Sequence, residues 1–416
     1  MTEITGWNQG ELLQEHEKTP FGELPKNREE YLFTRYKYHH PQSLLPAKYA
    51  KDYLRFIEPY IPEALISRLN FTEIKNLASF FTGRITSFFG FETRLNKNDG
   101  RADYLLAISS RKGEREALLS LLKKNDLSTQ FLQKIEWQRI KTFIEQWSED
   151  TSILSRKVIG LWLEFDTAYN QSAAPVPGLF VQIKPISKDE NGNIEDFSWI
   201  TKELLPILTG GNLTSKTEDM IKKSFTQLPN KSSILFVAAM ISRKSSIIRT
   251  TIKMGVTQIV PYLESLGWQD EQNTLSSLLD EIKKYSTRII LHLNIGEELN
   301  PKIGLECSFS PDMYHCEKRW SAFFDYLIQK GVCLPEKKEQ ILSFMGVDQE
   351  DSHQEFTFES YVPSVKLNNA NFTGAIVRYL SHIKIQYQPN QPITAKAYPG
   401  VRLFGRPNEV RDCSIQ

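Results

Sequence analysis

The sequence is poor in cysteine, balanced in charge and free of long apolar runs, and each of these features excludes a class of protein. Its 416 residues include four cysteines without the spacing of a disulfide framework, so we expect a reducing compartment, the cytoplasm, rather than secretion. With 51 basic and 50 acidic residues, no overall electrostatic field favours nucleic acid or a membrane as a partner. The longest apolar runs have the length of strands, so we expect no transmembrane helix.

Several motifs of common binding and catalytic sites are also missing. The sequence contains no GxxxxGK[ST] or GxGxxG loop for phosphates, no GxSxG nucleophile turn and no aspartate-rich DDxxD box. Neither His315-Cys316 nor His39-His40 is accompanied by a complete ligand set, so we expect no metal site at either pair. A phosphate ligand would therefore need cationic side chains to hold it. We expect no required cofactor, with Mg²⁺ as an inessential addition.

What the sequence does contain is one pattern that occurs five times: two strand-like runs separated by a turn and followed by a helical stretch. In each pair of runs, one face is mostly apolar and the other is largely polar or charged. The five pairs are Ser87–Leu95 with Arg101–Ser109, Val158–Asp166 with Gly178–Pro185, Ser233–Ile241 with Ile247–Met254, Arg288–Ile295 with Lys302–Phe309, and His382–Gln388 with Ile393–Pro399.

Ten antiparallel strands with helices on one face close most economically into a barrel, because closure removes the edges of the sheet. We therefore predict an α+β fold, a ten-stranded antiparallel β-barrel surrounded by α-helices, with a polar interior wide enough for ligands. An open sheet in two lobes is the alternative. Helices are expected at Pro62–Phe81, Glu114–Lys124, Ser128–Trp147, Phe197–Leu208, Thr217–Leu228, Thr257–Leu266, Leu275–Tyr285, Lys318–Lys330, Glu336–Met345 and Phe372–Leu380, with a helix-ending turn at Thr209-Gly210-Gly211-Asn212.

The chain is expected to consist of an arm, one barrel domain and a tail. The arm covers residues 1–50, which are polar and unlike a signal peptide, and the domain covers residues 51–405. The tail, residues 406–416, ends in Cys413-Ser414-Ile415-Gln416, which has the form of a C-terminal prenylation box. We interpret this as a chance match, because no basic cluster or second lipid signal accompanies it.

Strand alternation assigns charged side chains to the interior of the barrel. Buried cations are costly unless they are neutralised, and a diphosphate is a suitable ligand because arginine and lysine both bind phosphate oxygens. Internal carboxylates, Glu92, Glu164, Asp166 and Glu306, would neutralise some of these cations. If the sheet were open, the same charges would simply be solvated. The six expected interior cations are Arg101, Lys184, Arg249, Lys253, Lys384 and Lys396.

Four parts of the sequence carry a resemblance to a known family. They are Phe91-Glu92-Thr93-Arg94-Leu95-Asn96 followed by Arg101, then Leu163-Glu164-Phe165-Asp166 with the later run Phe180–Pro185, then Arg249–Lys253, and finally Tyr387 with Tyr398. These segments resemble hairpins of the ABBA-type aromatic prenyltransferases, and the dimethylallyltryptophan synthase group in particular. The third segment matches the family at its arginine, and its lysine lies one inward step later.

The resemblance implies transfer of a dimethylallyl or longer group from an allylic diphosphate to an aromatic acceptor, either a small molecule or a residue of a peptide. The six interior cations would bind the diphosphate. Glu92 would orient the acceptor and take its proton, with His292 or His382 as the alternative base. Neither nucleic acid nor a membrane is implied as a partner. The residues implied to shield the allylic cation and to form the acceptor pocket are Trp162, Phe180, Gln182 and Tyr398.

Two other readings stay open from the sequence. The same barrel without catalysis would be a chamber for an anionic metabolite or peptide. An ordinary α+β scaffold with interaction helices would bind no diphosphate at all.

Overall fold

The computed structural model describes nine segments of the chain, residues 47–110, 113–123, 129–167, 175–189, 191–243, 247–270, 273–310, 317–349 and 372–407. The predictions for most of the N-terminal arm, for His39-His40, for His315-Cys316 and for the prenylation-like tail fall outside these segments. No helix in the described segments has both the length and the apolar composition needed to cross a membrane.

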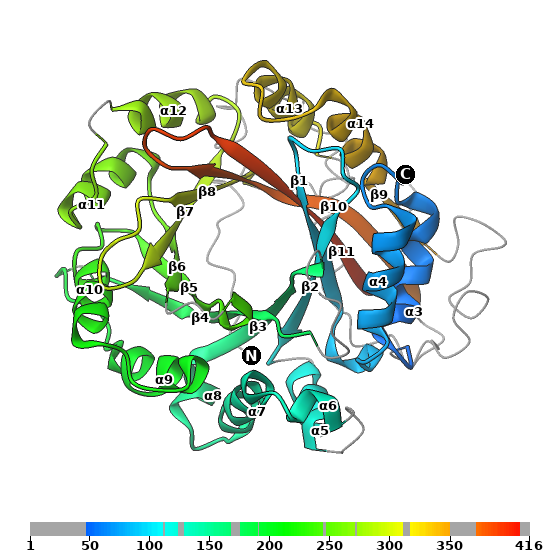
Figure 1. Cartoon of the computed structure of the whole chain (residues 1–416), viewed down its shortest axis with the longest axis horizontal. Helices are drawn as coiled ribbons and strands as arrows, with labels where there is room; N and C mark the ends of the chain where they lie inside the picture. Colours follow the sequence, from blue (N-terminus) through cyan, green and yellow to red (C-terminus); the bar gives the residue numbers. More distant parts are fainter. Residues whose placement is uncertain are drawn as a thin grey trace, which may run out of the picture.

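The strands form one closed antiparallel barrel, which Figure 1 shows end-on. The strands follow one another around the ring from β1 to β8, β10 pairs with β8 and β11, and β11 returns to β1. Of the eleven strands in the sheet, β9 is attached outside the ring, so ten strands close the barrel as predicted. The bounds are β1 Phe88–Arg94, β2 Ala102–Ser109, β3 Val158–Phe165, β4 Gly178–Ser187, β5 Ser233–Ala239, β6 Ile248–Lys253, β7 Arg288–Ile295, β8 Ile303–Ser308, β9 Gly346–Gln349, β10 Phe372–Tyr387 and β11 Thr394–Pro407.

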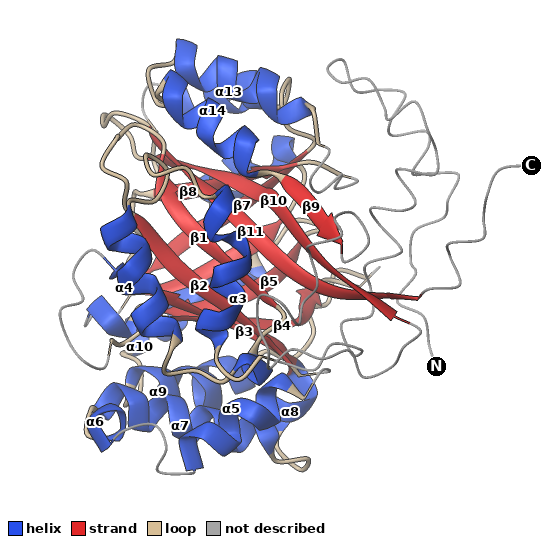
Figure 2. Ribbon diagram, turned by 90° about the vertical axis from the view of Figure 1, so that its right-hand side faces the viewer, coloured by secondary structure: helices blue, strands red, loops and turns tan. Residues whose placement is uncertain are grey.

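All five predicted hairpins are confirmed, and one predicted helix is wrong. The segment Phe372–Leu380 belongs to β10, which pairs there with β11 and β9. The apolar spacing of this segment is compatible with the helical period of 3.6 residues and with the strand period of 2. Its pairing with β9 and β11 makes it a strand, and most of β11 lies later in the sequence than any local pattern can show. The last hairpin is therefore much longer than the others, and Figure 2 shows it projecting beyond the barrel.

Helices cover the outside of the barrel (Figures 1 and 2). The α-helices are α3 Ala50–Ile57, α4 Arg68–Ala78, α5 Glu114–Lys123, α6 Thr129–Leu132, α7 Ile135–Ser148, α8 Ile153–Lys157, α9 Leu205–Thr209, α10 Ser215–Thr226, α11 Ile259–Ser265, α12 Thr274–Ile282, α13 Arg319–Gln329 and α14 Pro335–Phe344. Shorter helical turns are the 3₁₀ segments Glu58–Tyr60, Gly83–Ile85, Ile241–Arg243 and Val256–Gln258 and the π-helical Ile200–Leu204.

Local residues explain where several of these helices begin and end. Ser67 and Thr214 accept hydrogen bonds from backbone N–H groups in the first turns of α4 and α10. Gly210 has φ 79°, the left-handed conformation that glycine adopts easily, and it ends α9 at the predicted turn.

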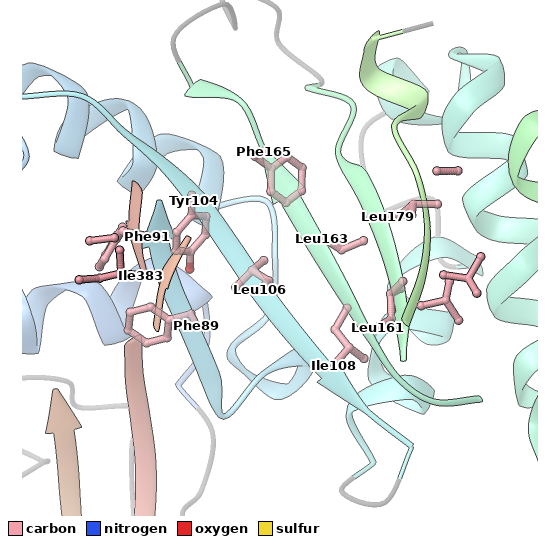
Figure 3. Packing of buried hydrophobic residues seen from close by; sticks show 14 of the residues in the cluster. Phe89, Phe91, Tyr104, Leu106, Ile108, Leu161, Leu163, Phe165, Leu179 and Ile383 are labelled. Carbon is pink, nitrogen blue, oxygen red and sulfur yellow. The ribbon is translucent and has the colours of Figure 1, made fainter. Parts of the chain in front are cut away.

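The hydrophobic core lies between the outer face of the barrel and the helices. Figure 3 shows this layer on β1, β2, β3 and β4, where alternate residues of each strand, such as Leu161 and Leu163, are fully buried. The opposite residues of the same strands, such as Trp162 and Glu164, face the lumen. The predicted placement of the aliphatic residues on the outside is therefore confirmed for these strands, and the inner face carries aromatic as well as charged side chains.

Candidate functional site

The lumen contains a cavity of about 190 Å³ with an aromatic wall. Phe88 of β1 meets Trp162 of β3 edge to face, with 4.8 Å between ring centroids. Trp162 is the direct cross-strand neighbour of Phe180 in β4. Phe236 of β5 and Tyr398 of β11 line the same cavity. Five strands thus surround one space with aromatic rings.

Glu92 of β1 is a buried carboxylate with two partners from β11. The Lys396 ammonium and the Tyr398 hydroxyl both donate hydrogen bonds to it. Burial raises the pKa of Glu92, but the charges of Lys396 and Lys384 and these hydrogen bonds outweigh burial and lower it to about 2. Burial lowers the pKa of Lys396, and Glu92 more than reverses this, so Glu92 and Lys396 form an ionised pair.

Two further carboxyl groups beside Glu92 are shifted in the opposite direction. Asp103 of β2 is the direct cross-strand neighbour of Glu92, and burial together with the charge of Glu92 raises its pKa to about 7. Burial and Glu92 also raise the pKa of Glu164 in β3. Arg243 lies near this group and binds Asp166 through two hydrogen bonds of 3.0 and 2.7 Å. The neighbouring carboxyl groups therefore hold different protonation states at neutral pH.

Two histidines flank the partly buried carboxylate of Glu306 in β8. His292 Nε2 lies 3.0 Å from Glu306 Oε2, and His292 Nδ1 lies 3.4 Å from the hydroxyl of Thr251. Burial and Lys384 lower the pKa of His292 to about 3, so the ring is neutral and must donate from Nε2 to the carboxylate. Both ring nitrogens of His292 are therefore engaged, which fits a hydrogen-bonded lumen residue better than a free base.

His382 of β10 completes this group. Its ring stacks on Tyr398, with 4.1 Å between centroids, and its Nδ1 lies 3.2 Å from the Ser381 hydroxyl. Burial lowers the pKa of His382 to about 4. Like His292, His382 is therefore neutral at pH 7, and its contacts with Tyr398 and Ser381 fix the orientation of its ring.

Lys384 of β10 lies between these two clusters and lines the cavity. Its side chain is 6 % exposed, and its ammonium lies 5.9 Å from the centroid of the Tyr398 ring. Burial and the charge of Arg249 lower its pKa to about 7, although Glu92 acts in the opposite direction. The described residues provide no hydrogen-bond acceptor for this amine.

Arg249 of β6 is the third cation of the lumen. Its Nε donates to the side chain of Asn294, its cross-strand neighbour on β7, at 2.9 Å. Its guanidinium lies 5.7 Å from the centroid of the Phe180 ring. Asn294 and Phe180 therefore orient the guanidinium.

The structure brings some of the residues predicted for the site to the cavity and leaves others away from it. The predicted residues that line it are Trp162, Phe180, His292, Lys384 and Tyr398. Glu92 is hydrogen-bonded to Tyr398 and Lys396, and Arg249 lies over the ring of Phe180, so these three adjoin the wall without lining the cavity. Arg101, Lys184 and Lys253 are exposed and do not line it. Lys253 belongs to a separate groove at the end of the barrel, which Arg288 also lines. Gln182 lies against Gly160 of β3 instead of lining the cavity.

Several residues of the site were not predicted from the sequence. Phe88 and Phe236 line the cavity, and Arg243 holds Asp166 from a 3₁₀ turn after β5. Alternation could have found Phe88, since it lies on the same face of β1 as Glu92. Arg243 has no such signal, because it lies outside a strand. Within the described segments, no three His, Cys, Asp or Glu residues come together as a possible metal site.

Comparison with known proteins finds resemblance only in structure. No family model and no curated protein matches the sequence. The barrel is similar to the apo form of the prenyltransferase PriB, at 10% identity and a TM-score of 0.46, over 86% of this chain and 95% of that one. It is also similar to 5-dimethylallyl tryptophan synthase from Streptomyces coelicolor in complex with DMASPP and Trp, at 11% identity and a TM-score of 0.44, over 88% and 96% of the two chains. For AnaPT from Neosartorya fischeri the identity is 12% and the TM-score 0.41, over 77% and 78%. The ten-stranded barrel itself is established by the strand pairing of this chain.

Proposed function

We propose that this protein transfers a short allylic group, such as dimethylallyl, from a diphosphate to an aromatic acceptor inside the barrel. One observation carries the proposal: Lys384 lines a cavity with aromatic walls, and the ionised pair of Glu92 and Lys396 adjoins the wall residue Tyr398, while the guanidinium of Arg249 lies over the wall residue Phe180. The reaction needs each of these parts, because a diphosphate must leave, a cation must be shielded and an acceptor must be oriented.

The three cations would bind the diphosphate of the donor. Lys384 is the strongest candidate, because its amine faces the cavity without an acceptor among the described residues. A bound anion would raise the pKa of Lys384 and keep it protonated. Cations positioned where negative charge develops favour departure of the leaving group without a metal cluster. We therefore expect donor binding to persist in the absence of Mg²⁺.

The aromatic wall would protect the allylic cation. Aromatic faces attract cations, and Trp162, Phe180 and Tyr398 present such rings to the cavity. A closed barrel also excludes water, which would otherwise capture the cation. The wall is therefore suited to the intermediate as well as to the acceptor ring.

Glu92 and Asp103 suit two different roles toward the acceptor. Glu92, with its pKa of about 2, stays ionised and would accept a hydrogen bond from an N–H or O–H of the acceptor. Such a contact stabilises the positive charge that the acceptor ring gains when it is attacked. Asp103, with its pKa of about 7, is better able to take up the released proton at neutral pH. Neighbouring carboxyl groups with separated pKa values are typical of acid–base pairs.

The size of the cavity favours short donors. Its volume is about 190 Å³, whereas an apolar cavity of about 150 Å³ holds one benzene molecule. A dimethylallyl group fits this space more readily than a longer prenyl chain.

Donor binding and product formation test the proposal separately. We would measure thermal stabilisation by dimethylallyl thiolodiphosphate, with EDTA and with Mg²⁺, and then screen aromatic acceptors with dimethylallyl diphosphate by mass spectrometry. Stabilisation in EDTA that is lost in Arg249→Ala and kept in Lys184→Ala is the expected result, since Lys184 is exposed away from the cavity. Binding without any product would favour the non-catalytic chamber. No stabilisation in either condition would refute the proposal.

A further inference from the structure

The amine of Lys384 is buried inside the barrel without a hydrogen-bond acceptor among the described residues. Its residue is 94 % buried, since 6 % of its surface is exposed, and it lines the lumen cavity. The amine lies 5.9 Å from the centroid of the Tyr398 ring, and the described residues offer it no hydrogen-bond acceptor. A buried amine without an acceptor is costly when it is charged. The arrangement therefore favours the neutral amine when the cavity holds no anion.

Neighbouring cations strengthen this preference. Lys396 is the direct cross-strand neighbour of Lys384 on β11, and it is held in its charged form by Glu92. Positive charge close to a desolvated lysine is a known way to make its amine nucleophilic at neutral pH. The pKa of Lys384, lowered to about 7 first by burial and then by Arg249, agrees with this geometry. The titratable and charged groups that face Lys384 are Lys396, Arg249, Glu92, Glu164, Glu306, His292 and His382.

The backbone leaves room for the side chain of Lys384 to reach the cavity. Gly304 of β8 lies beneath it, and a Cβ built on Gly304 would approach Lys384 Cε to 2.9 Å and His292 Cβ to 3.2 Å. Any larger residue at this position would displace the lysine or crowd the histidine. The amine is therefore directed over a glycine toward a cavity with aromatic walls.

We propose that Lys384 captures the carbonyl group of a small aromatic aldehyde or ketone as an imine inside the barrel. The neutral amine attacks the carbonyl carbon, and the carbonyl oxygen takes up a proton. The resulting carbinolamine loses its hydroxyl as water, and the nitrogen loses its proton, leaving a C=N bond. Overall, one amine and one carbonyl give one imine and one water, without oxidant or reductant.

Glu164 is placed to supply the proton for loss of water. It lines the same cavity, and burial together with Glu92 raises its pKa above the usual range of a carboxyl group. The ring of the ligand would pack among Trp162 and Phe180, which are cross-strand neighbours on the cavity wall. This activity uses the same cavity and the same lysine as the function proposed above, but it needs no prenyl donor, so its test does not depend on that function.

Reductive trapping tests the capture directly. The full chain is incubated with benzaldehyde and sodium cyanoborohydride at pH 7, and the adduct is located by intact mass and peptide mapping. At that pH about half of an amine with pKa 7 is neutral, compared with roughly one in 2,500 for an ordinary lysine. We expect one early adduct on Lys384, with a trapping rate that rises with pH and levels off above about 8.

Matched variants separate capture by Lys384 from general labelling. Lys384→Arg keeps the positive charge but removes the nucleophile, and is expected to lose the early adduct. Lys302→Arg is the control, because the pKa of Lys302 is also lowered by burial but its side chain is exposed and does not line the cavity. The variant Lys302→Arg should keep the adduct on Lys384. The variant Gly304→Ala should form that adduct more slowly, because the added Cβ crowds the lysine side chain. Early adducts spread over surface lysines of the unaltered protein would overturn the proposal, whether or not Lys384→Arg folds.

Discussion

Glu306 of β8 accepts a hydrogen bond from His292 of β7, with 3.0 Å between Oε2 and Nε2. The interaction joins two adjacent strands inside the barrel, and it holds a neutral imidazole against an ionised carboxylate. The lumen is thus built from paired groups whose pKa values differ from those of the free side chains.

The first prediction concerns the protonation of this histidine. Because burial lowers the pKa of His292 to about 3, its ring should stay neutral from pH 8 down to about pH 4. NMR of the imidazole Cε1–H should show no titration in that window, while exposed histidines titrate near 6.5. A midpoint for His292 close to that of an exposed histidine would contradict the hydrogen-bonding arrangement described here.

The second prediction concerns the pair formed by Glu92 and Lys396. Removing either charge leaves the other buried without its partner, so Glu92→Gln and Lys396→Gln should each lower the free energy of unfolding by about 3 kcal/mol. The double variant should lose less than the sum, with a coupling of about 1 kcal/mol or more. Urea unfolding at pH 7 measures all three. Strictly additive losses would show that the two charges do not interact.

A third prediction follows from the raised pKa of Asp103. Because its pKa rises from near 4 in the unfolded chain to about 7 in the folded protein, the folded state binds a proton across that window. This contribution to stability is present below pH 4 and is lost as the pH rises through 7. Asp103→Asn cannot ionise, and its amide oxygen can still accept the 3.1 Å hydrogen bond from the Thr167 backbone.

The variant Asp103→Asn should therefore match the unaltered protein near pH 4 and be more stable at pH 8, by about 2 kcal/mol once partial exposure of the side chain is allowed for. Denaturant unfolding at the two pH values measures the difference. An equal stability at pH 8 would show that Asp103 ionises without cost.

The fourth prediction concerns the length of the prenyl donor. Trp162 contributes to the cavity wall and packs against Phe88. Trp162→Ala should enlarge the cavity, and should increase the affinity for geranyl relative to dimethylallyl thiolodiphosphate by about tenfold, a difference of about 1.4 kcal/mol. Calorimetric titration with both ligands measures the ratio, and Ile135→Ala, an exposed site on α7, is the control. An unchanged affinity ratio would show that Trp162 does not limit the length of the prenyl group that the pocket accepts.

The sequence predicts the architecture of this protein far better than its cavity. Alternation within short strands identified all five hairpins, because burial on the outer face imposes a period of two on each strand. It also assigned Trp162, His292, Lys384 and Tyr398 to the inside. The exception was Phe372–Leu380, whose strand pairing depends on β9 and β11, which no local pattern reveals.

Alternation cannot tell how deep along the barrel a residue lies. Lys253 and Lys184 share a face with Arg249 and Phe180, but they lie further along their strands and are exposed, away from the cavity. The pairing of charges is equally invisible, since Lys396 finds Glu92 at a separation of 304 residues. Depth and pairing both depend on the register between strands, which only the closed barrel defines.

The way the barrel closes has a consequence for how the protein is made. β11 is the neighbour of β1, so the ring is sealed by strands from the first and last hairpins of the fold. During synthesis on the ribosome, β1 cannot pair with β11 until β11 has emerged, and contacts between such distant segments form slowly. Until then the edge of β1 is open and Glu92 has neither Lys396 nor Tyr398. Chaperone dependence and loss of yield should therefore be concentrated in the interval before β11 pairs with β1.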